Sequence, residues 1–161
     1  MRVKKAFYPW LVASIVCMAA IFISSAQSAD VSSELSGAMT RGLFSSIGAR
    51  FGIVESAWLL DRLEYFLRKT AHLMIFAVLG FCVFNAVRQL SVNDRKAFLL
   101  SLCGCSFYAA TDEFHQYFVP GRACMWQDWL IDTAGVLLGC AVALLFALRY
   151  RKKRGKQQGQ T

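Results

Sequence analysis

The sequence predicts an all-α fold, a small polytopic membrane helix bundle of about four transmembrane helices with an outer amphipathic segment. The chain has 161 residues, enough for one domain, and 57% of them are hydrophobic. Its mean hydropathy of +0.43 is too high for an ordinary soluble domain. The apolar residues also gather in four separate segments, which are residues 7–25, 71–87, 97–108 with a polar extension to 118, and 126–148.

The lengths of these segments place polar residues at the membrane boundary. A hydrocarbon layer of about 30 Å needs roughly 20 helical residues, so the first and fourth segments are long enough alone. The second and third reach that length only by including their polar neighbours. These neighbours are Arg68, Lys69 and His72 before the second segment, and Asp112, Glu113, His115 and Gln116 at the end of the third.

The first segment has two interpretations. Its basic start, apolar core and small residues at 24–29 resemble a secretory signal peptide, with cleavage after Ala26 or Ser28. The apolar stretch is longer than a usual signal core, so we favour a retained helix. Either outcome leaves the orientation of the remaining segments unchanged.

The outer amphipathic segment precedes the second apolar segment. From Trp58 to Arg68, apolar residues recur at spacings of three and four between charged ones. This pattern predicts a helix on the outer surface that runs into the second segment. A lid over the outer helix ends is the alternative.

The basic residues predict the orientation. The N-terminus, the connection between the second and third segments, and the C-terminal tail hold 12 of the 18 basic residues but only one acidic residue, Asp94. This bias is typical of cytoplasmic flanks, so we expect a multi-pass membrane protein with both termini cytoplasmic. We expect one domain over residues 1–150 and a disordered basic tail over 151–161. The net charge of +8 then reflects topology and attraction to anionic lipid, and it does not favour a nucleic-acid partner.

The six cysteines predict neither disulfides nor a zinc site. Five lie within apolar segments, where a thiol packs as a small hydrophobic group. Only Cys124 falls in a predicted outer loop, and the Cys103/Cys105 spacing does not suit zinc.

Helical spacing brings polar residues of three segments to one side of the membrane. Residues at i and i+4 share a helix face, which aligns Asp112 with Gln116, Asp128 with Asp132, and Arg68 with His72. We expect these groups to form an outward-facing polar pocket. Its candidate residues are Arg68, Lys69, His72, Asp112, Glu113, His115, Gln116, Arg122, Asp128 and Asp132.

Two interpretations of this cluster remain open. Its carboxylates and cations are sufficient to bind a polar head group or a divalent metal and to transfer protons. Alternatively, they form a buried ion-pair network that only holds the bundle together. Gly135 and Gly139, on the same face as Asp128 and Asp132, have the spacing that lets helix backbones approach, and we expect them to serve packing. No established catalytic motif is present, so catalytic residues, metal and cofactor stay unassigned, as does enzymatic activity.

At these residues the chain resembles the VanZ-like family of small bacterial membrane proteins. The resemblance covers about residues 8–148, and residues 31–57 match nothing in it. The matching pieces are Ser24-Ser25, Arg68-Lys69-Thr70-Ala71-His72 with Gly80, Thr111-Asp112-Glu113-Phe114-His115-Gln116 with Pro120-Gly121-Arg122, and Asp128 to Asp132 with Gly135 and Gly139. The resemblance implies an envelope protein of the bacterial inner, cytoplasmic membrane, linked to resistance to teicoplanin-type glycopeptide antibiotics.

Three functional hypotheses follow. The first is a membrane protein that binds or modifies an envelope lipid or lipid-linked cell-wall precursor at the outward polar pocket. The second is a small transporter or proton-coupled carrier that forms a homo-oligomer through Gly135 and Gly139. The third is a structural membrane subunit whose polar cluster only locks the bundle.

Overall fold

The chain forms a helical bundle, seen in a computed structural model that describes residues 5–28, 34, 36–42, 45–46, 57–122 and 124–158. Its long helices are α1 (Phe7–Ser25), α3 (Ala57–Arg88), α4 (Asp94–Gln116) and α5 (Trp126–Gln158). A short helical stretch at 36–42 lies between α1 and α3, and no strand occurs among the described residues. The all-α prediction is therefore confirmed.

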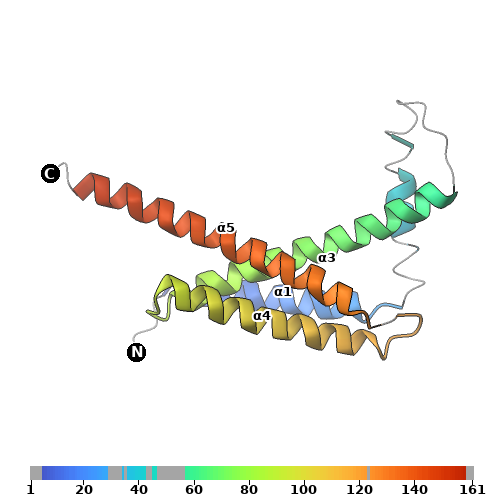
Figure 1. Cartoon of the computed structure of the whole chain (residues 1–161), viewed down its shortest axis with the longest axis horizontal. Coiled ribbons are helices and arrows are strands. Elements are labelled where there is room, and N and C mark those ends of the chain that lie inside the picture. The colour runs from blue at the N-terminus through green and yellow to red at the C-terminus, as the bar shows by residue number, and fades with distance from the viewer. Residues whose placement is uncertain are drawn as a thin grey trace.

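The other three long helices pack around α3. This helix contacts α1, α4 and α5, and its contact with α5 is the most extensive in the bundle. Figure 1 shows α3 and α5 crossing, with α1 and α4 running alongside each other beneath the crossing. Large apolar side chains fill the space between them, including Ile21, Phe76, Leu79, Phe84 and Val136.

Three glycines permit the close α3–α5 crossing. A Cβ atom on Gly80 would lie 2.6 Å from the carbonyl oxygen of Val136, and Cβ atoms on Gly135 and Gly139 would overlap carbonyl oxygens of α3. The two backbones thus meet with no room for a side chain. Gly135 and Gly139 face α3 of the same chain, so an oligomer formed through them would first have to open this contact.

Three helices have the length and apolarity to cross a membrane. Among the described residues these are Phe7–Ser25, Trp58–Arg88 and Trp126–Lys153. Helix α4 is long enough, at 23 residues, but it has charged side chains near both ends. The structure therefore supports a membrane bundle with three clear spans, where the sequence predicted about four.

The predicted outer amphipathic segment forms the first turns of α3. The helix continues without interruption from Ala57 to Arg88, about 48 Å for 32 residues, so it exceeds a 30 Å hydrocarbon layer. Figure 1 shows its first turns extending beyond the other helices, in line with the rest of α3. The segment therefore does not fold back as the lid that was the alternative, and much of the connection before it lies outside the described residues.

The basic tail also differs from expectation. Helix α5 continues to Gln158, whereas we expected disorder from residue 151. Lysine, arginine and glutamine are good helix formers, and extending an existing helix avoids the cost of nucleation. Cations near a helix C-terminus are further stabilised by the helix dipole.

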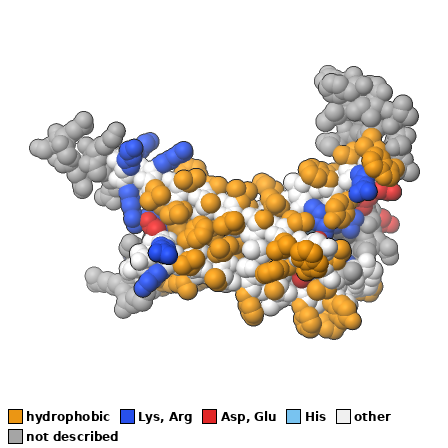
Figure 2. All heavy atoms as spheres, in the orientation of Figure 1, with side chains coloured by type: hydrophobic (Ala, Val, Ile, Leu, Met, Phe, Trp, Pro, Cys, Tyr) orange, Lys and Arg blue, Asp and Glu red, His pale blue; other side chains and the backbone are white. Residues whose placement is uncertain are grey.

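The two ends of the bundle differ in charge. At the end where α5 finishes, Asp94 accepts ion pairs from Arg88 (2.9 Å) and Arg151 (2.9 Å), which ties α3 and α5 to the start of α4. Figure 2 shows lysine and arginine side chains gathered at this end and hydrophobic side chains covering the middle. The candidate site lies at the opposite end.

Candidate functional site

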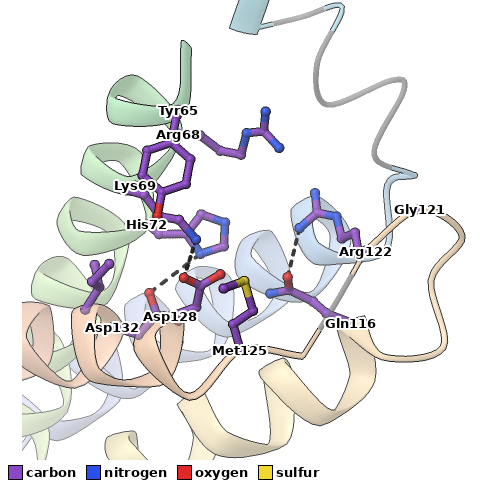
Figure 3. Close-up of a pocket in the computed structure, with 11 residues that line it drawn as sticks. Tyr65, Arg68, Lys69, His72, Gln116, Gly121, Arg122, Met125, Asp128 and Asp132 are labelled. Carbon is purple, nitrogen blue, oxygen red and sulfur yellow. Dashed lines mark hydrogen bonds and ion pairs between the residues drawn. The ribbon is translucent and has the colours of Figure 1, made fainter. Parts of the chain in front are cut away.

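A polar cavity of about 180 Å³ lies where α3 passes the start of α5 and the turn after α4 (Figure 3). Polar residues from three parts of the chain surround it, with a few apolar ones. Its lining residues are Tyr65, Arg68, Lys69, His72, Gln116, Gly121, Arg122, Met125, Asp128, Ile131 and Asp132.

One wall consists of paired side chains from α3 and α5. The ammonium group of Lys69 forms an ion pair with Asp128, and His72 Nδ1 lies 3.6 Å from Asp132 Oδ1. Lys69 and His72 are three residues apart and the aspartates four, so each pair occupies neighbouring turns of its helix. Figure 3 shows Lys69 and His72 directed from α3 towards the two aspartates of α5.

Asp132 is the most deeply buried charged group of this wall. Its side chain is 1% exposed, and its second oxygen, Oδ2, has no hydrogen-bond partner. A buried carboxylate oxygen without a partner costs free energy, about 1–3 kcal/mol or more for a charged group. Asp132 lines the cavity, so a ligand whose hydrogen-bond donor reaches this buried oxygen would satisfy it.

A second set of hydrogen bonds joins α1 to α4. Asp112 Oδ2 accepts from the Ser25 hydroxyl at 2.7 Å and from Gln116 Nε2 at 3.0 Å. The other end of Gln116 faces the cavity, where its Oε1 accepts from Arg122 at 3.1 Å. All three helix residues are buried, so these bonds fix the end of α1 against the end of α4.

Arg122 links the turn after α4 to the end of α1. Besides Gln116, its guanidinium donates to the backbone carbonyl oxygens of Gln27 (3.0 Å) and Ser24 (3.3 Å). Carbonyl groups at a helix C-terminus lack partners within the helix, and a cation stabilises them. Gly121, with φ of 75°, allows the turn that directs Arg122 there.

Arg122 has no carboxylate within ion-pair distance among the described residues, since its hydrogen-bond acceptors are all neutral oxygens. Burial lowers the pKa of its guanidinium, and the charge of nearby Arg68 lowers it further. Nearby carboxylates raise it in part. An arginine remains protonated under these conditions, so the cavity has a cation available to an anion.

Seven of the ten predicted residues line the cavity, and three do not. Asp112 belongs to the α1–α4 hydrogen bonds described above. Glu113 is buried and accepts a hydrogen bond from the backbone amide of Met125 at 3.2 Å. His115 faces away, stacked on Phe22 with ring centroids 4.6 Å apart.

Sequence reasoning missed several cavity residues. Tyr65 precedes Lys69 by four residues, so extending the α3 face by one turn would have found it, and Lys69 lies 5.3 Å from the centre of its ring. Met125 and Ile131 gave no polar signal. Ser25, the partner of Asp112, was indicated only by the family resemblance.

The carboxylates do not gather into a metal site. Within the described part of the chain, no three His, Cys, Asp or Glu side chains are placed to hold a metal ion together. Asp128 and Asp132 are each paired to a different residue of α3. The arrangement suits a polar organic group with both an anionic part and a hydrogen-bond donor.

Comparison with known proteins gives one match. The family described as VanZ/LLP1 matches residues 10–147, most of the chain. Neither a curated protein nor a solved structure matches the sequence significantly.

Proposed function

This chain belongs to the VanZ/LLP1 family, and from that premise we propose that it is a multi-pass protein of the cell envelope that binds the polar head group of an envelope lipid or lipid-linked cell-wall precursor. The binding site is the cavity between α3, α5 and the turn after α4. A link to teicoplanin-type resistance would follow from such binding at the envelope.

The proposed topology makes α4 the fourth span and places the cavity on the outer side. Helix α4 runs beside α1 and contacts α3 and α5 along the bundle, so it lies at the same depth as the apolar helices. Its charged residues fall at its two ends, where water or head groups solvate them. The basic flanks then lie in the cytoplasm and the cavity faces outwards.

Asp132 is the observation that best supports head-group binding. An ion-pair network that only locks a bundle would satisfy its most buried carboxylate, because partial satisfaction is costly. Asp132 instead retains an unpartnered oxygen beside a cavity that also contains Arg122. These two groups offer an acceptor and a cation to one ligand.

The test compares two conservative changes at opposite ends of the bundle. Asp132→Asn removes the charge in the cavity, and Asp94→Asn makes the same change in the ion pairs at the basic end. Lipid bound to each purified protein is measured as phosphorus per protein, and folding is measured by thermal unfolding. A hydrogen bond to a charged group contributes about 1.5–3 kcal/mol, so we expect Asp132→Asn to weaken binding roughly tenfold or more.

The control should retain lipid at the wild-type level even where its unfolding temperature falls. Equal lipid retention by wild type and folded Asp132→Asn would refute the proposal. A fall in unfolding temperature for both variants with no change in bound lipid would support the structural hypothesis instead.

The structural hypothesis fits one half of the cluster. Asp112, Ser25 and Gln116 form hydrogen bonds between α1 and α4, away from the cavity except for one end of Gln116. We assign these residues to holding the bundle. The transporter hypothesis has no such specific support, because Gly135 and Gly139, through which the oligomer would form, already contact the backbone of α3.

A further inference from the structure

A larger apolar groove adjoins the polar cavity. It measures about 670 Å³ and lies between α1, α3 and the helical residues 36–42. Its walls are mainly apolar, and Met74 on its α3 side is 54% exposed, so the groove is reachable from the side of the bundle. The apolar lining residues are Ile21, Met39, Leu67, Ala71, Met74 and Ile75.

The groove and the cavity share three residues. Arg68, His72 and Arg122 line both of them, so the apolar space ends at two arginines. Such an arrangement, apolar on one side and cationic at its end, matches a molecule with a hydrocarbon chain attached to an anionic group. Lipid merely coating the bundle needs no arginines at the end of an apolar groove.

The charges around the cavity indicate which head group would fit. Lys69 is neutralised by Asp128, and Arg68 pairs with Glu64 at 3.2 Å. Two groups keep bonding capacity: the guanidinium of Arg122, whose hydrogen bonds all go to neutral oxygens, and the buried, unpartnered Oδ2 of Asp132. A phosphate with a nearby protonated amine complements both, because the phosphate carries the negative charge and the amine donates hydrogen bonds.

We propose, building on the head-group site above, that the ligand is a phospholipid with a phosphoethanolamine head group. Its acyl chain lies in the groove between α1 and α3, its phosphate lies against Arg122, and its ammonium group donates to Asp132. The lipid enters sideways from the membrane past Met74. A soluble phosphate compound would leave the groove empty and bind more weakly.

The experiment uses the full-length protein in detergent with two lipids of identical acyl chains, phosphatidylethanolamine and phosphatidylcholine. Both contain the phosphate and are zwitterionic, but the three methyl groups of choline remove its N–H donors. The bound fraction of each lipid is measured by native mass spectrometry. We expect at least a tenfold preference for phosphatidylethanolamine in the wild type, and loss of that preference in Asp132→Asn.

Groove occupancy is tested with tryptophan substitutions on α3. Ala71→Trp fills the groove, while Val78→Trp places the same side chain on an exposed part of α3 outside both spaces. We expect a tenfold or greater loss of phosphatidylethanolamine binding only for Ala71→Trp. Thr70→Trp, also exposed and lining the groove, serves as a second variant if Ala71→Trp does not fold.

The outcomes separate this inference from the proposed function. Equal binding of the two lipids by the wild type overturns the phosphoethanolamine assignment, and equal effects of Ala71→Trp and Val78→Trp overturn the groove. In either case a loss of lipid in Asp132→Asn would leave the head-group site standing. Soluble glycerophosphoethanolamine, bound as tightly as the lipid, would also overturn the groove.

Discussion

Asp112 and Asp132 are both buried carboxylates at the same end of the bundle, yet their surroundings differ. Asp112 accepts hydrogen bonds from Ser25 and Gln116 on one oxygen. Its other oxygen is unpartnered, but Asp112 does not line the cavity. Asp132 faces the cavity with a single histidine beside it. Asp112 therefore joins α1 to α4, whereas Asp132 lies on the cavity wall in the next helix, α5.

The Ser25–Asp112 hydrogen bond should stabilise the bundle by a measurable amount. Hydrogen bonds between membrane helices contribute about 0.6 kcal/mol on average and about 1.7 kcal/mol at most. We predict a coupling energy in this range for the double-mutant cycle Ser25→Ala with Asp112→Ala, measured by unfolding in mixed micelles.

Ser24→Ala with Asp112→Ala provides the matched control. The Ser24 hydroxyl bonds to Ala20 in its own helix, so its coupling to Asp112 should be close to zero. Similar coupling in both cycles would show that the Ser25 bond does not join the helices as described.

For single residues, the sequence allowed us to predict which side chains share a helix face, but not which residues of other helices they contact. Spacing of four aligned Arg68 with His72 and Asp128 with Asp132, and all four line the cavity. The rotation of α4 relative to its neighbours is set by packing, which spacing does not encode. His115, expected in the pocket, therefore stacks on α1 instead.

At the scale of helices, the α3–α5 crossing determines where the cavity wall forms. Gly135 lies three residues after Asp132, and Gly80 lies eight after His72. The contact of backbones at these glycines holds the two helices close enough for Lys69 and His72 to reach the aspartates. Gly80 received no structural role from the sequence, because a single glycine predicts no contact until its partner helix is known.

Gly139→Ala should destabilise the bundle. The new Cβ would overlap backbone atoms of Ala77 and Phe81, which have no side-chain freedom to yield. Forcing extra volume into a packed contact costs about 1–3 kcal/mol, so we predict a loss of that size in the free energy of unfolding.

Gly104→Ala is the control for this change, since Gly104 is also within a helix but has nothing within 4 Å of the added atom. There we expect no loss, or a small gain from the better helix propensity of alanine. If both variants unfolded at the same denaturant concentration, the crossing would not depend on backbone contact at Gly139.

Helix lengths were predicted less well than helix existence. Apolar segments end where charged residues begin, but helices continue through charged residues that favour helix formation. Helix α5 accordingly extends past the apolar segment at 126–148, whereas the extension of α3 before residue 71 was predicted as the outer amphipathic segment. Helix α4 is long enough to cross a membrane, but the charged residues at its ends leave it less apolar than the three clear spans.

At the scale of the whole molecule, the bundle has a basic end and an opposite end that contains the cavity. Ion pairs around Asp94 close the basic end, and the cavity and groove open at the other. The hydropathy of the sequence predicted the membrane class, and the positions of its charged residues predicted a basic end and an opposite end with mixed charges. The groove was beyond prediction, because it depends on the spacing between α1 and α3 and on residues 36–42.

The orientation can be measured through one cysteine. Cys124 lies exposed in the turn between α4 and α5, while the other cysteines lie within the helices. We predict that a membrane-impermeant maleimide labels the wild type in intact cells and that Cys124→Ser abolishes the labelling. Labelling of Cys124 only after the membrane is opened would place the cavity on the cytoplasmic side.

Head-group binding in the cavity is tested most directly by mapping which residues a bound lipid head group contacts. Phosphatidylethanolamine with a photoactivatable group on its head is incorporated with the protein into nanodiscs, cross-linked, and mapped by peptide mass spectrometry. Head-group binding in the cavity predicts cross-links on the peptides containing residues 65–72 and 122–132, reduced in Asp132→Asn. Cross-links found only on residues outside the cavity, such as the exposed Trp58 and Phe118, and unchanged in Asp132→Asn, would contradict it.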